Sequence, residues 1–402
     1  MIHADASHSG VGTGNPTLIP MVLWKQTTGN YVESSPAVVN GVVYVGSYDD
    51  NVYALNAANG AKIWSYPTGK GVASSPAVAN GMVYIGSDDN NIYALNAANG
   101  KKVWSYPTGG NVGYSSPAVV NGVVYIGSLD GNLYALNAAN GNKLWNYTTP
   151  DQVFSSPAVV NGVVYIGSWN DSVYALDANN GNKLWNYTTG YEIFSSPTVV
   201  NGVVYIGSFD GNVYALNATT GDKIWNYLTG NFVYSSPAVL NGVVYIGSFD
   251  GNVYALNANN GAQIWNYTTG NKIYSSPAVA NGVVYIGSSD YKIYALNATN
   301  GNKVWSFQTL YAIVSSPAVV NGVIYVGSDD DNVYALGASS TSSPSPISTS
   351  GTSASPTVPE FPNQALVITL VASIMIVLSV VIISKKRMTW KSNLTATPKK
   401  NH

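Results

Sequence analysis

The chain has 402 residues and a formal net charge of −2, with 9% of its residues charged and 46% hydrophobic. This weak, balanced charge lacks the basic character that nucleic-acid binding requires. The chain has no cysteine, so disulfides and thiolate metal sites are excluded. The histidines are His3, His8 and His402, and the one arginine is Arg387. The middle of the chain therefore lacks His, Arg and Cys, which are the usual catalytic side chains.

Residues 1–21 form a lead-in, after which the sequence repeats every 40 residues with one step of 41. Each repeat has a Ser-Ser-Pro block and, at a fixed position, a tryptophan. Eight copies with this period are typical of propellers and solenoids. The repeat tryptophans are Trp24, Trp64, Trp104, Trp145, Trp185, Trp225, Trp265 and Trp305.

Each repeat predicts four short β-strands. In the copy at residues 195–230, two apolar runs are joined by Asn201 and Gly202, and Asn-Gly favours the tight type I′ turn of a hairpin. An Asp-Gly turn and a connection ending in glycine separate the remaining strands, the last of which is centred on Lys-x-Trp. Four strands in about 40 residues predict a propeller blade, so we expect an all-β, eight-bladed β-propeller.

The two ends of the repeat region are complementary. The last module, residues 315–338, lacks its tryptophan strand, whereas a single tryptophan strand around Trp24 precedes the first module. We therefore predict that residues 22–28 complete the last blade and close a ring spanning 22–338, which removes an exposed sheet edge. An open solenoid is the alternative.

The repeat resembles the pyrroloquinoline-quinone (PQQ) repeat family through Gly207 to Leu216 and Ala218 to Trp225. The resemblance implies that the repeat tryptophans dock each blade against its neighbour. It also implies one of two functions: quinoprotein dehydrogenases of the family bind PQQ and calcium in the ring centre, whereas non-enzymatic members, such as a bacterial outer-membrane assembly lipoprotein, are scaffolds for partners.

The residues present favour a non-enzymatic member. The dehydrogenases share an adjacent cysteine pair, carboxylate and asparagine ligands for calcium, an arginine near the quinone and a tryptophan floor. The repeats of this chain contain neither cysteine nor arginine. We therefore expect no catalytic residue, no metal site and no cofactor, neither PQQ nor Ca²⁺. A hydrolase that uses paired carboxylates is a further alternative, although no pattern pairs Glu33 with Glu192, the two glutamates of the repeats.

The C-terminal part predicts a membrane anchor. Residues 339–362 are a Ser/Thr/Pro-rich stalk, residues 363–384 an apolar transmembrane helix, and residues 385–402 a basic tail. The apolar core of the helix, 365–383, is long enough at 1.5 Å per residue to nearly span a bilayer of about 30 Å. Its basic flank places the tail in the cytoplasm and the propeller outside the cell. A buried core helix is the alternative.

Two short segments are similar to surface-protein signals. Pro359 to Pro362 resembles an archaeal Pro-Glu-Phe sorting signal, at which an exosortase-like enzyme would remove the span. His3 to Gly10 resembles the lead-in of surface propellers that follows a secretion signal, and we interpret the missing signal as a truncated gene start. An extracellular propeller also fits six candidate glycosylation sites, Asn146, Asn170, Asn186, Asn217, Asn266 and Asn297.

Variation among the repeats is concentrated at two positions that a four-stranded blade places on one face. The residue after Gly-Ser accepts side chains as different as Asp88 and Trp169, so we expect it to be exposed. The residue before Ser-Ser either joins an exposed patch or packs between blades near the axis. Aromatic residues at these positions predict a binding face: Tyr48, Trp169, Phe209, Phe249, Tyr114, Phe154, Phe194, Tyr234 and Tyr274.

These observations favour a cell-surface-anchored propeller that binds envelope proteins or cell-surface glycans as a scaffold, without catalysis. The alternative is a PQQ-dependent oxidoreductase-like protein with a quinone and Ca²⁺ in the channel. The aspartates of the same turns, such as Asp210 and Asp250, form a ring of carboxylates that either attracts cations or only shapes the turns.

Overall fold

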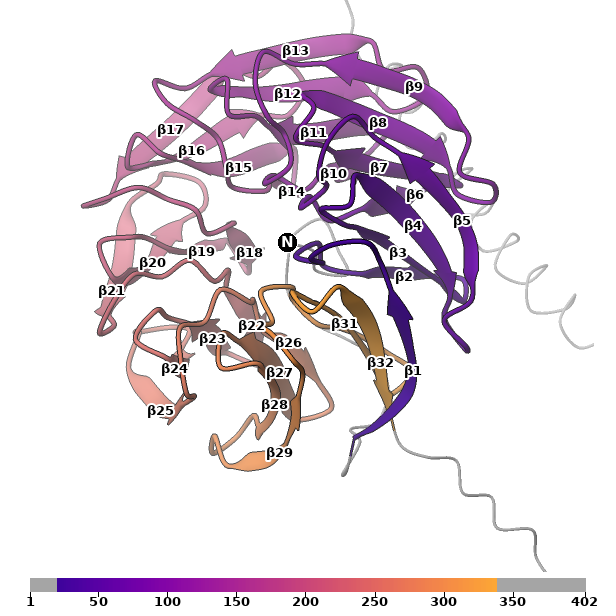
Figure 1. The fold of residues 1–402 in the computed structure, drawn as a ribbon. Coiled ribbons are helices and arrows are strands. Elements are labelled where there is room, and N and C mark those ends of the chain that lie inside the picture. Colours follow the sequence, from indigo (N-terminus) through magenta and orange to yellow (C-terminus); the bar gives the residue numbers. More distant parts are fainter. Residues whose placement is uncertain (1–19, 338–402) are drawn as a thin grey trace, which may run out of the picture. The chain divides into compact units, whose positions relative to one another are not determined.

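The computed structural model describes residues 20–337, and these residues form eight four-stranded antiparallel sheets arranged as the blades of a propeller (Figure 1). The predicted eight-bladed all-β fold is therefore confirmed. The lead-in up to residue 19, the stalk, the apolar helix and the basic tail lie outside the described residues. Residues 20–337 contain no helix that is long and apolar enough to cross a membrane.

We number the blades 1 to 8 in chain order. Blades 1 to 4 consist of β2 (Ala37–Val39), β3 (Val42–Gly46), β4 (Asn51–Asn56) and β5 (Lys62–Pro67); β6 (Ala77–Ala79), β7 (Met82–Gly86), β8 (Asn91–Asn96) and β9 (Lys102–Pro107); β10 (Ala118–Val120), β11 (Val123–Gly127), β12 (Asn132–Asn137) and β13 (Lys143–Thr148); and β14 (Ala158–Val160), β15 (Val163–Ser168), β16 (Ser172–Asp177) and β17 (Lys183–Thr188).

Blades 5 to 8 repeat this pattern. They consist of β18 (Thr198–Val200), β19 (Val203–Gly207), β20 (Asn212–Asn217) and β21 (Lys223–Leu228); β22 (Ala238–Leu240), β23 (Val243–Gly247), β24 (Asn252–Asn257) and β25 (Gln263–Thr268); β26 (Ala278–Ala280), β27 (Val283–Ser288), β28 (Lys292–Asn297) and β29 (Lys303–Gln308); and β30 (Ala318–Val320), β31 (Val323–Ser328) and β32 (Asn332–Gly337), joined by β1 (Met21–Thr27).

The Asn-Gly dipeptides make the first hairpin of each blade, as the sequence predicts. Asn201 and Gly202 both have positive φ, at 51° and 77°, which is the backbone of a type I′ turn. The short first strands lie nearest the axis, and the second and third strands are almost completely buried between neighbouring blades. The core is therefore a series of inter-blade layers, in which Val, Ile, Leu and Tyr of one blade pack on the next.

The repeat tryptophans dock each blade on its neighbour, as the family resemblance implies. The Trp225 Nε1 donates to the carbonyl oxygen of Ala258 in the next blade at 2.9 Å, and the Tyr205 hydroxyl donates to the same oxygen at 3.2 Å. The indole lies so close to Gly261 that an added Cβ would be 2.7 Å from Trp225 Cε3. A side chain at this glycine would therefore push the two blades apart.

A second set of contacts forms a closed circle around the channel. The second serine of each Ser-Ser-Pro block donates its backbone N–H to the Oγ of its counterpart in the next blade, at 2.7 to 3.0 Å. The circle closes where Ser316 N donates to Ser35 Oγ at 2.9 Å. We call these eight hydrogen bonds the serine circle.

The N-terminal strand completes blade 8, as predicted. β1 pairs antiparallel with β32, with Trp24 opposite Ala335 and Thr27 opposite Asn332, and the Thr27 hydroxyl donates to Asn332 Oδ1 at 2.7 Å. The Trp24 Nε1 donates to the Ala57 carbonyl oxygen in blade 1 at 2.8 Å. The open solenoid is excluded, because blade 8 and blade 1 are joined by the same contacts as the other blades.

Two glycine-to-alanine variants would isolate the contribution of tryptophan docking. Gly202 and Gly221 have nearly equal φ of 77° and 79°, but an added Cβ meets nothing within 4 Å at Gly202 and lies 2.7 Å from the Trp185 ring at Gly221. Gly202→Ala should cost about 1 kcal/mol from backbone strain alone, and Gly221→Ala about 2 kcal/mol more from the clash. Urea unfolding followed by circular dichroism measures both, and equal losses would contradict the docking role.

Candidate functional site

Two loops of every blade meet on one face around the channel. The loop before the first strand contains the residue that precedes Ser-Ser, and the residue that follows Gly-Ser lies in the loop between the second and third strands. A backbone hydrogen bond joins the two loops, as where Phe209 N donates to the Glu192 carbonyl oxygen at 2.9 Å. The variable positions of the sequence are therefore brought together at the mouth of the channel.

We call the residues before Ser-Ser the collar and the residues after Gly-Ser the second tier. The collar is Glu33, Ala73, Tyr114, Phe154, Phe194, Tyr234, Tyr274 and Val314. The second tier is Tyr48, Asp88, Leu129, Trp169, Phe209, Phe249, Ser289 and Asp329.

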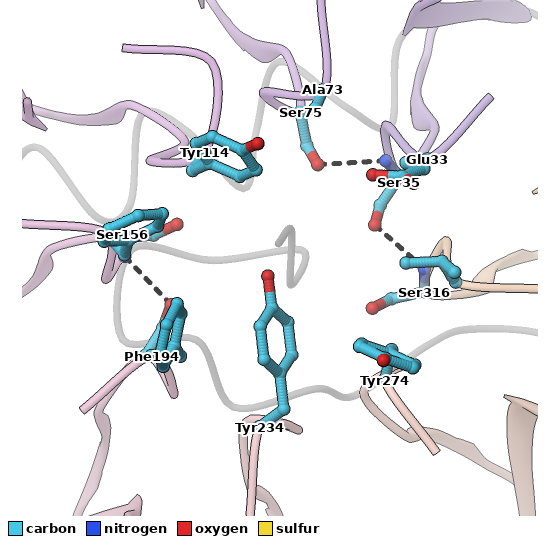
Figure 2. Close-up of a pocket in the computed structure, with 13 residues that line it drawn as sticks. Glu33, Ser35, Ala73, Ser75, Tyr114, Ser156, Phe194, Tyr234, Tyr274 and Ser316 are labelled. Atoms are coloured by element: carbon cyan, nitrogen blue, oxygen red, sulfur yellow. Dashed lines mark hydrogen bonds between the residues drawn. The ribbon is translucent and has the colours of Figure 1, made fainter. Parts of the chain in front are cut away.

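The collar lines the central channel. Its eight side chains and serines of the serine circle surround a cavity of about 60 Å³, into which Tyr234 points (Figure 2). Of the two alternatives for this position, the structure selects the one near the axis. Tyr114 is 38% exposed and the other seven are half-buried, so the collar packs between blades and still presents its edges to solvent.

The prediction that the second tier is exposed is wrong. All eight side chains are half-buried, and three of them, Trp169, Phe209 and Phe249, stack on collar rings. Phe209 stacks on Phe194 with centroids 4.3 Å apart, and Trp169 stacks on Phe154 at 4.6 Å. The second tier therefore supports the collar as well as facing solvent.

Aromatic rings of blades 3 to 7 form one continuous group on this face. Phe194 contacts Tyr234, and Tyr234 contacts Tyr274, both with centroids 5.3 Å apart. Phe232 joins the group 4.8 Å from Phe209, a residue that the sequence-based prediction missed because it lies two positions before the collar. We call this group the aromatic sector: Tyr114, Phe154, Trp169, Phe194, Phe209, Phe232, Tyr234, Phe249 and Tyr274.

Tyr48 is the one predicted member of the binding face that joins this group through its hydroxyl, which interacts with that of Tyr114, and not through a described ring contact. It belongs to blade 1, and its hydroxyl donates to Glu33 Oε2 at 3.3 Å. It thus lies between the Glu33 carboxylate and the edge of the aromatic sector at Tyr114.

Three carboxylates from blades 8, 1 and 2 lie on the opposite side of the channel mouth from the aromatic sector, and we call Glu33, Asp88 and Asp329 the acidic sector. Burial raises the pKa of each. For Asp329, burial and the charges of Glu33, Asp330 and Asp331 raise the pKa to about 7. Asp88 Oδ1 and Asp329 Oδ1 are buried and accept no hydrogen bond from the part of the chain that the structure describes.

The aspartates of the neighbouring turns differ from the acidic sector because hydrogen bonds satisfy their carboxylate oxygens. Asp210 Oδ2 accepts from the Tyr214 hydroxyl at 2.6 Å and from Gly190 N at 2.8 Å, and its Oδ1 accepts from Asn212 N. Burial alone would raise the pKa of Asp210, but these hydrogen bonds outweigh it and lower the pKa below its ordinary value. The ring of turn aspartates is thus committed to shaping the loops. Within residues 20–337 no three His, Cys, Asp or Glu residues are grouped so that they could hold a metal ion.

The six candidate glycosylation sites divide into two groups. Asn146, Asn186 and Asn266 occupy the same place on outermost strands and are exposed. The other three are half-buried, and exposure is what separates the two groups, since side chains of both make local hydrogen bonds. Asn170 Nδ2 donates to the Tyr174 hydroxyl, and the side-chain oxygens of Asn217 and Asn297 accept from the N–H groups of their turns. The structure thus leaves the first group better placed for modification.

Comparisons with known proteins agree with this architecture. A family model described as "Beta-alanine-activating enzyme, beta-propeller" matches residues 6–203, and one described as "Outer membrane protein assembly factor BamB" matches residues 232–342. No protein of curated function matches the chain in sequence.

Solved structures with the same fold include both functional kinds. BamB from Moraxella catarrhalis is similar with a TM-score of 0.70 at 20% identity, over 80% of this chain and 100% of that chain. Quinohemoprotein alcohol dehydrogenase from Comamonas testosteroni is similar with a TM-score of 0.70 at 17% identity, over 83% of this chain and 79% of that chain. The computationally designed Ika8 protein gives 0.72 at 15% identity, over 79% and 99%. At these identities the likeness concerns the fold alone.

The acidic sector predicts an unusual dependence of stability on pH. Because the pKa of Asp329 is raised to about 7 in the folded protein, its contribution to stability is complete below about pH 4 and is lost as the pH rises through 7. Asp329→Asn should therefore stabilise the protein at about pH 8, on the order of 1 kcal/mol after solvent screening, and raise Tm by about 2 °C. The difference should vanish at about pH 4.

Thermal unfolding at several pH values, followed by circular dichroism, measures this effect. Asp210→Asn is the matched control from an equivalent turn. It should lower Tm at about pH 8, because it weakens hydrogen bonds that the Asp210 carboxylate accepts in the folded protein. A lower Tm for Asp329→Asn at that pH would contradict the uncompensated burial of this carboxylate.

Proposed function

Because the chain is a β-propeller of PQQ-like repeats, we propose that it is a binding scaffold without catalysis whose contact surface is the mouth of the central channel. The observation that carries the proposal is the aromatic sector. Nine rings from five consecutive blades touch one another on one face of the propeller.

Rings in this position suit binding for a physical reason. Aromatic side chains provide a large contact area at low conformational cost, and they are enriched at the centres of protein interfaces and in sugar-binding sites. Stacking already immobilises Phe194 and Phe209 in the free protein, so little further entropy is lost when a partner covers them. Phe232, which is 42% exposed, extends the sector outwards from the channel.

The channel lining does not fit the cofactor of the quinoproteins. PQQ is a planar tricycle that carries three carboxylates, whereas the cavity at the mouth measures about 60 Å³, enough for a few water-sized groups. Its described lining contains serine, tyrosine, phenylalanine, alanine, valine and Glu33, and no lysine or arginine to compensate an anion. We derive no redox step for this protein from that chemistry.

The proposed location follows from the sequence outside the described residues. We propose that the apolar segment 363–384 anchors the chain in the membrane, that the stalk 339–362 holds the propeller outside the cell, and that the basic tail 385–402 lies in the cytoplasm. The exposed sequons at Asn146, Asn186 and Asn266 support an extracellular propeller. Envelope proteins or surface glycans would then be the partners.

A triple variant tests the contact surface. Full-length protein is applied to a glycan array and to a peptide library, beside a variant with Trp169, Phe209 and Phe249 changed to alanine. We expect binding signals to fall by about tenfold or more, because the variant removes the centre of the aromatic sector. The matched control replaces Leu184, Ile224 and Ile264, which are about half-exposed on the outer strands of the same blades, and should bind as the native protein does. Equal binding by all three proteins would refute the proposal.

A ligand titration tests the absence of quinone chemistry. The full chain is mixed with PQQ and Ca²⁺ in excess, and Tm and the quinone absorbance are recorded. We expect neither to change, since a ligand that binds the folded state raises Tm by mass action. A raised Tm together with a shifted absorbance band would favour the oxidoreductase instead.

A further inference from the structure

We infer that the channel mouth binds the cationic end of a lysine or arginine side chain presented by a partner protein. This inference rests on the proposed scaffold function and names the chemistry of its partner. It arises from the opposition of the two sectors across the channel: the acidic sector comes from blades 8, 1 and 2, and the aromatic sector from blades 3 to 7.

The two sectors face one another closely enough to interact. Tyr234 of blade 6 points its hydroxyl across the channel, with Glu33 of blade 1 on the far side (Figure 2). Burial, the charge of Glu33 and the neighbouring Tyr114 and Tyr274 together raise the pKa of Tyr234. A group that enters the mouth therefore meets the Glu33 carboxylate on one side and ring faces and hydroxyls on the other.

Two carboxylate oxygens of the acidic sector lack a hydrogen-bond donor among the described residues, although Glu33 accepts a hydrogen bond from Tyr48. Asp88 Oδ1 and Asp329 Oδ1 are buried without a hydrogen-bond partner among the described residues, so their charge is poorly compensated. Neither residue lines the cavity, so both would act on a cation in the mouth through their charge and not by accepting its hydrogen bonds. Asp88 is partly compensated by a hydrogen bond from the Asn111 side chain and by the charge of Lys70. The like charges of Asp89 and Asp50 oppose this compensation.

The surroundings of Asp329 and Glu33 are also negative. Asp330, Asp331 and Glu33 act on Asp329, and Asp88 acts on Glu33. The acidic sector is thus under-compensated, and its charge favours a cation.

The aromatic sector favours an organic cation over a metal ion or an anion. Ring faces attract ammonium and guanidinium groups. The protein already shows this contact at the edge of the sector, where Lys272 Nζ lies 5.3 Å from the Phe249 ring centroid. No described group of three carboxylates or other ligands is arranged to hold a metal.

The dimensions of the mouth favour a side chain of a protein over a larger cationic ligand. The cavity of about 60 Å³ accommodates an ammonium or guanidinium end and little else. Around it, Phe232 and Tyr191 continue the aromatic surface away from the axis, with exposures of 42% and 51%, and stack at 6.5 Å. A polypeptide that inserts one basic side chain would cover this surface with its flanking residues.

The test uses the full chain and four probes observed by saturation-transfer difference NMR. Three are acetylated, amidated pentapeptides of glycine with a central lysine, arginine or norleucine, and the fourth is n-butylammonium. We expect the lysine and arginine peptides to bind and the norleucine peptide, which has an uncharged side chain of the same length as the lysine stem, to bind about tenfold more weakly or not at all. Added salt should weaken binding of the charged peptides.

Charge-neutralising variants locate the site. Asp88→Asn combined with Asp329→Asn should weaken binding of both basic peptides by about tenfold, whereas Asp222→Asn, an exposed aspartate in a turn on the opposite face, should leave it unchanged. Thermal unfolding of the double variant controls for loss of folding. Binding should also be weaker below pH 7 than above it, because Asp329 gains a proton there.

The outcomes separate this inference from the proposed function. Equal binding of the lysine and norleucine peptides, or an unchanged affinity in the double aspartate variant, would overturn cation recognition. The scaffold function would stand even if cation recognition were overturned, provided that the aromatic triple variant lost its binding on the arrays. If n-butylammonium bound as tightly as the lysine peptide, the role of a partner polypeptide would be overturned. If none of the probes bound and the aromatic triple variant matched the native protein on the arrays, both proposals would fail.

Discussion

The serine circle is the constraint on which the channel mouth depends. Each link joins the backbone N–H of one blade to a buried side-chain oxygen of the next, and the last link, from Ser316 to Ser35, spans the whole repeat region. Because the links occupy the residue two positions after the collar, they fix the radius at which the eight collar side chains surround the channel. The tryptophans perform the same task at the outer edge, where Trp225 and its counterparts hold neighbouring blades together.

This division of labour explains why one face is free to vary. The ring is stabilised by the serine circle, the Asn-Gly turns and the tryptophans. The turn aspartates, such as Asp210, stabilise the loops through hydrogen bonds. The collar and second-tier side chains are attached to this frame through backbone hydrogen bonds, so their identity does not affect closure. Side chains as unlike as Glu33 and Phe194 therefore occupy equivalent places, and the differences between blades become differences around the mouth.

The acidic sector lowers the stability of the folded protein, and the contacts between the blades offset this loss. Asp88 and Asp329 have buried oxygens without donors, which reduces the stability of the free protein when they are ionised. A cation in the mouth would offset part of this cost through its charge, whereas the carboxylate of Asp210 is already compensated by hydrogen bonds. The same physical feature thus explains the raised pKa of Asp329 and the preference of the mouth for a cation.

The sequence by itself determined the strands of each blade, the number of blades and the closure of the ring by residues near Trp24. Turns such as Asn201-Gly202 are local signals that define the blade, and the period of the tryptophans gives the number of blades. The strand missing from the last repeat indicated how the ring closes. It also predicted that nine aromatic residues share one face, and the structure groups eight of them through ring contacts. Only the tertiary structure decided that the second tier stacks on the collar, that Phe232 joins the aromatic sector, and that Tyr48 faces Glu33 instead. Glu33, Asp88 and Asp329 are far apart along the chain, and they become neighbours because blades 8, 1 and 2 are adjacent only when the ring is closed.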